Sequence, residues 1–177
     1  MRRLDERMLK RVLWLLLLLN MAAVFGLSAQ PAEVSTNETD AVIALPKQVF
    51  DAARPELAND FRYVKLFRFV VRKTAHFMEF ATLSVWAGWL LALYGKPRPF
   101  LLGAVFSAFY AATDELHQML VPGREGKISD WLIDASGAIV GALVIWLLFC
   151  CWQKRRTTSP ENGEEAQERQ MAENSRS

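Results

Sequence analysis

Side chains that could bind a metal ion, transfer a proton or hydrogen-bond a substrate occur at a few positions beside apolar stretches of the chain. These candidate catalytic residues are His76, Glu79, Asp114, Glu115, His117, Gln118, Asp130 and Asp134. His76 and His117 are the only two histidines of the 177-residue sequence. Ionisable side chains are costly near hydrocarbon, so a group of them beside apolar segments is by default a functional-site hypothesis.

Two kinds of chemistry suit these residue types. Imidazoles and carboxylates could ligate a divalent metal ion that activates water, and the candidate ligands are His76, Glu79, Asp114 and His117. Alternatively, His117 could act as a general base oriented by Asp114. Basic residues would then hold a substrate phosphate, and the candidates are Arg72, Lys73, Arg124 and Lys127. The spacing does not choose between the two, because no HExxH-like ligand pattern is present.

Four apolar blocks surround these residues and would position them. They are Val12–Ala29, Ala75–Tyr94, Phe100–Leu120 and Trp131–Trp152. A helix needs about 20 mostly apolar residues to cross a bilayer core of about 30 Å, and each block approaches that length. The sequence therefore predicts an all-α integral membrane protein with a four-transmembrane-helix bundle. The first block is longer than the core of a typical signal peptide, which favours an uncleaved anchor.

Basic residues near the ends of the blocks predict the orientation in the membrane. They cluster before the first block, in the short loop at Lys96 and Arg98, and after the last block at residues 154–156. By the positive-inside rule, both termini and the second loop lie in the cytoplasm, and the protein is a multi-pass protein of the inner (cytoplasmic) membrane. Seven basic residues in the first outer loop oppose this orientation, although six acidic residues accompany them.

The chain divides accordingly into a basic cytoplasmic N-terminus (1–11), a first transmembrane helix (12–29), an outer loop (30–74), a three-helix core (75–152) and a disordered cytoplasmic tail (153–177). Within the outer loop, Gln30–Asp40 is predicted to be irregular and mobile. Residues 57–73 carry basic and apolar faces at helical spacing. They predict an amphipathic helix that either lies in the headgroup layer or packs on the bundle.

In this topology three helices bring their polar residues to one depth. Residues three or four positions apart share one side of a helix, as do His76 and Glu79, or Asp130 and Asp134. The linker 121–129 closes over them, and the set predicts a polar site at the outer-leaflet interface. Taken singly, each side chain could instead reach the headgroups or pair within the bundle, and Asp130 could cap the fourth helix. Small residues at Gly137 and Gly141 would let that helix approach a neighbour closely.

The same residues form a pattern that resembles the VanZ-like membrane proteins. It reads Arg72-Lys73-x-x-His76-x-x-Glu79-Phe80-x-x-Leu83 and then Asp114-Glu115-x-His117-Gln118-x-x-x-Pro122-Gly123-Arg124-x-Gly126-x-x-x-Asp130-x-x-x-Asp134-x-x-Gly137-Ala138-x-x-Gly141. The resemblance spans Arg72–Gly141 and implies a four-helix membrane protein. The chain departs from the family at Asp134, a position that is often Asn. The founding member is associated with low-level resistance to teicoplanin, a lipid-bearing glycopeptide, so the resemblance also implies a link to glycopeptide resistance and the cell envelope.

Three functions fit these observations. The first is an enzyme, a membrane-embedded hydrolase or transferase, that acts on a lipid or a lipid-linked cell-envelope precursor. The second is a non-catalytic accessory protein that binds a lipid or glycopeptide, in which Arg124 and the basic residues 62–72 matter more than His117. Conduction of protons or ions ranks last, because the cytoplasmic halves of the helices hold few ionisable residues. Membrane lipids are the expected partners, with no nucleic acid, and the sequence does not indicate an oligomeric state.

Overall fold

The computed structural model describes residues 2–57 and 60–157, and the regular elements of this part of the chain are all helices, with no strand. Its elements are α1 (Arg2–Ser28), α2 (Ala32–Ala53), the short 3-10 helix η1 (Pro55–Leu57), α3 (Phe61–Leu93), α4 (Pro99–Gln118) and α5 (Ile128–Thr157). The predicted all-α class is confirmed. Residues 153–157 continue α5 and do not begin the predicted tail. The remainder of that tail lies outside the described residues.

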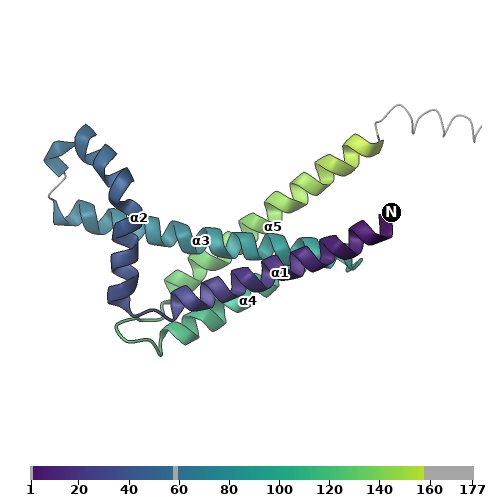
Figure 1. Ribbon diagram of the computed structural model, residues 1–177, viewed down its shortest axis with the longest axis horizontal. Helices are drawn as coiled ribbons and strands as arrows, with labels where there is room; N and C mark the ends of the chain where they lie inside the picture. Colours follow the sequence, from purple (N-terminus) through teal and green to yellow (C-terminus); the bar gives the residue numbers. More distant parts are fainter. Residues whose placement is uncertain (1, 58–59, 158–177) are drawn as a thin grey trace, which may run out of the picture.

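The helices α1, α3, α4 and α5 form an elongated bundle (Figure 1). The helices α1 and α4 run in one direction and α3 and α5 in the other, so the C-terminal ends of α1 and α4 meet the N-terminal end of α5 at one end of the bundle. The helix α2 also starts there. We call this end the polar end, because it carries the polar residues singled out above.

The helix α3 is the centre of the bundle, since it packs against α1, α2, α4 and α5. Its buried side chains include Phe80 and Leu83, which no solvent reaches. The helix α1 meets this core with Leu13, Leu17 and Val24, which recur at helical spacing and form one stripe. The opposite faces of α1, α4 and α5 expose large apolar side chains, as expected of helices surrounded by lipid.

Three helices are long and apolar enough to cross a membrane, among the residues that the structure describes: Asp5–Ser28, Phe61–Leu93 and Ile128–Cys151. The predicted span Phe100–Leu120 corresponds to α4, which does not belong to that group. Its last turns contain two acidic residues, a histidine and a glutamine, and they lower its apolar character. The chain is thus an all-helical membrane protein with three helices that meet the criteria for a span.

The basic amphipathic helix predicted over 57–73 corresponds from Phe61 onward to the first part of α3, which continues without a break into the apolar segment. The helix begins after Asp60, whose side chain accepts a hydrogen bond of 2.8 Å from the Arg62 backbone N–H and so caps it. At about 1.5 Å per residue, the 33 residues of α3 extend about 50 Å, which exceeds the bilayer core of about 30 Å. The helix α3 is thus longer than a bilayer core is thick, and its start packs against α2.

The prediction of an irregular segment at Gln30–Asp40 is wrong, because α2 begins at Ala32. The turn-favouring residues of this stretch are satisfied within the helix: Thr36 and Thr39 donate to the carbonyl oxygens of Ala32 and Ser35. Tertiary contacts then stabilise the helix. Asp40 accepts two hydrogen bonds from the Arg68 guanidinium on α3, at 2.5 and 2.7 Å.

Glycines let the helix backbones of the bundle touch. A Cβ added at Gly137 would lie 2.3 Å from the carbonyl oxygen of Phe77, and one at Gly141 would lie 2.2 Å from that of Ala81. Both distances are far below van der Waals contact, so these glycines of α5 rest on the backbone of α3. The predicted close approach of this helix is confirmed. Gly103 makes the equivalent contact between α4 and α3, because its Cβ would lie 2.6 Å from the Gly88 nitrogen.

We predict that Gly141→Ala destabilises the protein by about 1–3 kcal/mol, because the added methyl group forces α5 away from α3. The matched control is Gly26→Ala in α1, where an added Cβ meets nothing within 4 Å. That variant should be as stable as the wild type or slightly more stable, since alanine favours a helix. Thermal unfolding of the full chain in detergent, followed by tryptophan fluorescence, measures both. Equal melting temperatures for the two variants would contradict the close contact.

Candidate functional site

Two contacts join α3 and α5 at the polar end. The Lys73 ammonium lies 2.5 Å from the Asp130 carboxylate. Further into the bundle, His76 Nδ1 lies 3.9 Å from Asp134 Oδ1. Lys73 and His76 are three residues apart on α3, and their partners are four residues apart on α5. The two contacts therefore lie one helical turn apart along two helices that run in the same direction.

The His76 and Asp134 pair is buried but is not hydrogen-bonded. Asp134 is only 1% exposed, and 3.9 Å is too long for a hydrogen bond. Among the described residues, neither His76 Nδ1 nor Asp134 Oδ2 has a hydrogen-bond partner. Buried polar atoms of this kind are rare in proteins and costly. At this level, the interface between α3 and α5 therefore contains polar atoms that are not hydrogen-bonded.

A buried hydrogen-bond network joins the ends of α1 and α4. Asp114 Oδ2 accepts hydrogen bonds from Ser28 Oγ and from Gln118 Nε2, both at 2.8 Å. Gln118 Nε2 also lies 3.2 Å from Ser28 Oγ. All three side chains are buried, and the donors offset part of the cost of removing a carboxylate from water. The network fixes the last turn of α1 to the last turns of α4.

The structure corrects the predicted pairing of Asp114 with His117 as an oriented general base. The hydrogen bonds to Asp114 come from Ser28 and Gln118, and His117 instead stacks on Phe25 of α1 with ring centroids 4.4 Å apart. The Nδ1 atom of His117 is buried without a hydrogen-bond partner among the described residues. The imidazole thus packs against α1 and makes no hydrogen bond with the carboxylate predicted to orient it.

The predicted metal ligands do not form a metal centre. In the described part of the chain, no group of three or more His, Cys, Asp or Glu side chains is placed to hold a metal ion. Glu79 is half-buried on α3, where the charge of Asp114 acts on it electrostatically. The buried Glu115 accepts a hydrogen bond of 3.0 Å from the Lys127 backbone N–H, so it holds the linker between α4 and α5.

The linker between α4 and α5 lies against the junction of α1 and α2. The backbone N–H of Ala32 donates to the carbonyl oxygen of Pro122, and Arg124 Nη2 donates to the carbonyl oxygen of Leu27 at 3.2 Å. A cation at the end of α1 also interacts favourably with the negative end of the helix dipole. Gly123 makes this path possible, because its backbone has a φ of 76°, in the left-handed region that favours glycine.

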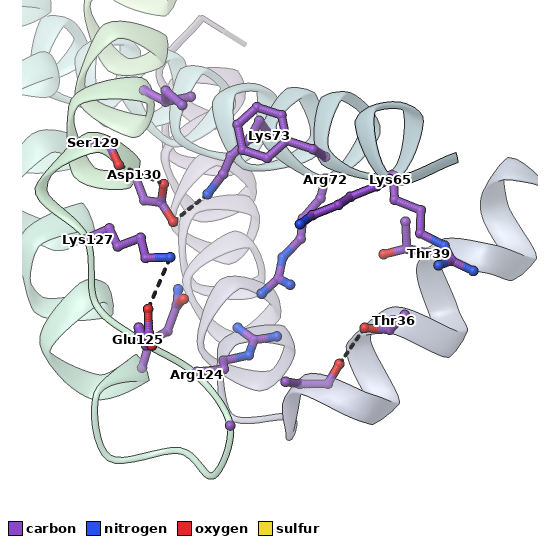
Figure 2. Close-up of a pocket in the computed structure, with 16 residues that line it drawn as sticks. Thr36, Thr39, Lys65, Arg72, Lys73, Arg124, Glu125, Lys127, Ser129 and Asp130 are labelled. Atoms are coloured by element: carbon purple, nitrogen blue, oxygen red, sulfur yellow. Dashed lines mark hydrogen bonds and ion pairs between the residues drawn. The ribbon is translucent and has the colours of Figure 1, made fainter. Parts of the chain in front are cut away.

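A basic pocket of about 510 Å³ opens between α2, α3, this linker and the start of α5 (Figure 2). The charged residues that line it are Lys65, Arg68, Arg72, Lys73, Arg124, Lys127, Glu125 and Asp130. Six of these are basic and two are acidic. Three of the cations are paired with carboxylates, because Lys73 contacts Asp130, Lys127 contacts Glu125 and Arg68 contacts Asp40.

Two cations of the pocket face each other without such a partner. Figure 2 shows Arg72 reaching from α3 and Arg124 from the linker, with their guanidinium groups pointing toward one another. In the described part of the chain, neither has a carboxylate within ion-pair distance. Burial, and then the positive charge of Arg72, lower the pKa of Arg124 from its usual value. The arrangement favours an anion between them.

The structure brings most of the predicted site residues to the polar end, but in different roles. Arg72, Lys73, Arg124, Lys127, Asp130 and Gln118 line the pocket. Asp114, Glu115 and Asp134 are buried behind it. His76 lies beside Asp134 at the interface between α3 and α5, and His117 lies against α1.

Sequence reasoning missed several residues of this end. Ser28 continues the buried stripe of α1 at helical spacing, and that periodicity could have identified it as an inward-facing polar residue. Lys65 and Arg68 were recognised as part of a basic face but not as pocket residues. Thr36 and Thr39 of α2 also line the pocket, and a segment predicted to be irregular gave no indication of this.

Comparison with known proteins agrees with the sequence pattern. A profile of the VanZ/LLP1 family matches residues 13–149, which is well over half of the chain. The chain belongs to the VanZ/LLP1 family. The predicted resemblance to VanZ-like proteins is thereby confirmed. Searches of curated proteins and of solved structures found no match.

We predict that Ser28→Ala destabilises this VanZ/LLP1 protein by about 1–3 kcal/mol, because it removes one of the two donors to the buried Asp114 carboxylate. The matched control is Ser136→Ala, since the Ser136 hydroxyl is exposed and donates only to the carbonyl oxygen of Ile133 in its own helix. Differential scanning fluorimetry in detergent compares the melting temperatures. If Ser28→Ala melts at the same temperature as Ser136→Ala, the network does not stabilise the polar end.

Proposed function

We propose that this VanZ/LLP1 protein binds the anionic headgroup of a lipid, or of a lipid-linked cell-envelope component, in the basic pocket at its polar end. The observation that carries the proposal is the excess of cations in the pocket. After its ion pairs are counted, Lys65, Arg72 and Arg124 have no carboxylate partner among the described residues. Guanidinium groups bind phosphate oxygens through several N–H donors at once, which suits a phosphate-bearing headgroup.

The geometry favours binding without turnover over catalysis. Two of the candidate acids or bases already have structural partners, since Asp114 bonds to Ser28 and Gln118 and Asp130 pairs with Lys73. His117 stacks on Phe25 and faces no carboxylate within hydrogen-bond distance. A general base must lie within hydrogen-bond reach of the substrate proton that it removes. Neither histidine lines the cationic pocket.

The proposal includes a placement in the membrane. We place both termini and the loop between α3 and α4 in the cytoplasm, with α4 as a fourth crossing of the inner membrane. The polar last turns of α4 are compatible with this, because Asp114, Glu115 and Gln118 are buried against neighbouring elements and not presented to lipid. The basic start of α3 and the pocket would then lie at the outer headgroup layer, where anionic headgroups are available.

The same placement suggests how the protein could affect a glycopeptide. A lipid-bearing antibiotic such as teicoplanin reaches the outer face of the membrane and its lipid-linked precursors. A protein that occupies an anionic headgroup there changes the surface that such an antibiotic meets. The link to glycopeptide resistance is therefore proposed as a consequence of headgroup capture, without chemical change to the antibiotic.

We predict that cysteine labelling places the two loops on opposite sides of the membrane. Single cysteines replace the exposed residues Glu125 and Lys96 in a background in which Cys150 and Cys151 are serine. A membrane-impermeant maleimide should label Glu125→Cys in intact cells, and Lys96→Cys only after permeabilisation. Labelling of both positions from the same side would overturn the fourth crossing.

We predict that the full chain, purified in mild detergent, carries a phosphate-bearing lipid that mass spectrometry detects. Arg124→Gln should retain about tenfold less of it, because a charge-assisted contact is lost. Arg62→Gln is the matched control, since Arg62 is exposed on the same basic face of α3 but lies outside the pocket. His117→Ala should also retain the lipid.

The same measurement separates capture from catalysis. Envelope lipids and precursors are compared in matched strains with and without the gene. Capture predicts the same set of species in both. A species that appears or disappears with the gene, and no longer does so in His117→Ala, would establish turnover and contradict the proposal.

A further inference from the structure

At one place in the pocket two positive charges face each other, and no carboxylate of the described residues is ion-paired with either. Arg72 and Arg124 are both half-buried, and their guanidinium groups point toward one another (Figure 2). Within the described residues, the Nε and Nη1 atoms of Arg124 are buried and have no hydrogen-bond partner. Like charges that face each other in a partly desolvated site are unfavourable unless something compensates them.

The carboxylates that act on Arg124 from a distance are each held elsewhere. Asp114 accepts from Ser28 and Gln118, and Glu115 accepts from the Lys127 backbone. Glu38 accepts a hydrogen bond of 2.8 Å from Gln30. None of the three can move between the guanidinium groups without breaking its present contact. Within the described residues no carboxylate is therefore free to lie between the two guanidinium groups, and the geometry favours an anion from a bound ligand.

We infer that Arg72 and Arg124 form a clamp for a terminal phosphate that carries two negative charges, the headgroup of a lipid phosphomonoester. The inference rests on the proposed capture of a headgroup and names its chemical class. Two guanidinium groups balance the charge of a phosphomonoester, which is about −1.5 to −2 near neutral pH. A phosphodiester carries one negative charge and would leave one guanidinium uncompensated. Lys65, the remaining cation without a carboxylate, is exposed, so water already compensates it.

The surrounding contacts hold one half of the clamp in place. Arg124 Nη2 is bonded to the carbonyl oxygen of Leu27 at the end of α1, which fixes the guanidinium, while the N–H groups on Nε and Nη1 have no acceptor among the described residues. Arg72 extends from α3, the central helix of the bundle. A site whose donors are fixed before binding loses less conformational entropy when the ligand enters.

The test is a titration of the full chain in uncharged detergent with three probes: dioctanoyl phosphatidate, dioctanoyl phosphatidylglycerol and inorganic phosphate. The first is a lipid phosphomonoester, the second a lipid phosphodiester and the third a free phosphate. Microscale thermophoresis measures each dissociation constant. We expect phosphatidate to bind about tenfold more tightly than phosphatidylglycerol, because only phosphatidate engages both guanidinium groups with a full charge.

The variants Arg72→Gln and Arg124→Gln should each weaken phosphatidate binding about tenfold and remove most of the preference over phosphatidylglycerol. Arg62→Gln removes the same charge outside the pocket and should keep both affinities and their ratio. Arg124 also anchors the linker to α1, so its variant could fail to fold. Arg72→Gln then carries the test, because Arg72 makes no ion pair or hydrogen bond with the other described residues.

The outcomes separate this inference from the proposed function. Equal affinity for the two lipids, still dependent on Arg72, would overturn the two-charge clamp and leave headgroup capture standing. Failure to bind either lipid would overturn both. Inorganic phosphate that binds as tightly as phosphatidate would support the charge preference of the clamp and overturn the lipid as its source.

Discussion

The close contact between α5 and α3 sets the register on which the polar end depends. Gly137 and Gly141 rest on the backbone of Phe77 and Ala81, so neither helix can slide past the other without a clash. One turn toward the polar end, that register places Asp134 beside His76, and a further turn places Asp130 beside Lys73. Because Gly137 and Gly141 have no side chain, the two parallel helices approach closely, and the polar side chains of the next turns reach from one helix to the other. The Lys73–Asp130 contact at the wall of the pocket follows from this alignment.

The polar residues differ in whether their charge has a partner within the protein. Ionised groups inside a membrane protein require partners, and three cations of the pocket have carboxylate partners, while Asp114 has hydrogen-bond donors. Among these contacts, Arg68–Asp40 and Lys73–Asp130 join α2 and α5 to α3, and Ser28–Asp114 joins α1 to α4. Arg72 and Arg124 are the half-buried cations of the pocket to which this compensation does not extend. Residues that look alike in the sequence therefore differ in role, some stabilising the fold and others available for a ligand.

The sequence predicted the helices and the location of the site better than its chemistry. Hydrophobic blocks and helical spacing are local properties, so α1, α3, α5 and the Gly137 contact could be predicted. The partner of each polar residue depends on tertiary packing, and for that reason Ser28 at the end of α1 and the stacking of His117 on Phe25 were missed. The helix α2 was missed because its Thr residues favour turns unless their hydroxyl groups are bonded within a helix. The sequence of α4 is interrupted by polar residues, so its apolar character is a weak indicator of whether this helix crosses the membrane.

The central claim is that an anionic headgroup occupies the space between Arg72 and Arg124. The most direct test is a cryo-electron microscopy map of the full chain, bound to a rigid antibody fragment and embedded in nanodiscs that contain phosphatidate. The account predicts density for a phosphate group in contact with both guanidinium groups, continuous with an acyl chain that leads into the bilayer. A map in which a carboxylate of the protein itself lies between the two arginines would contradict it.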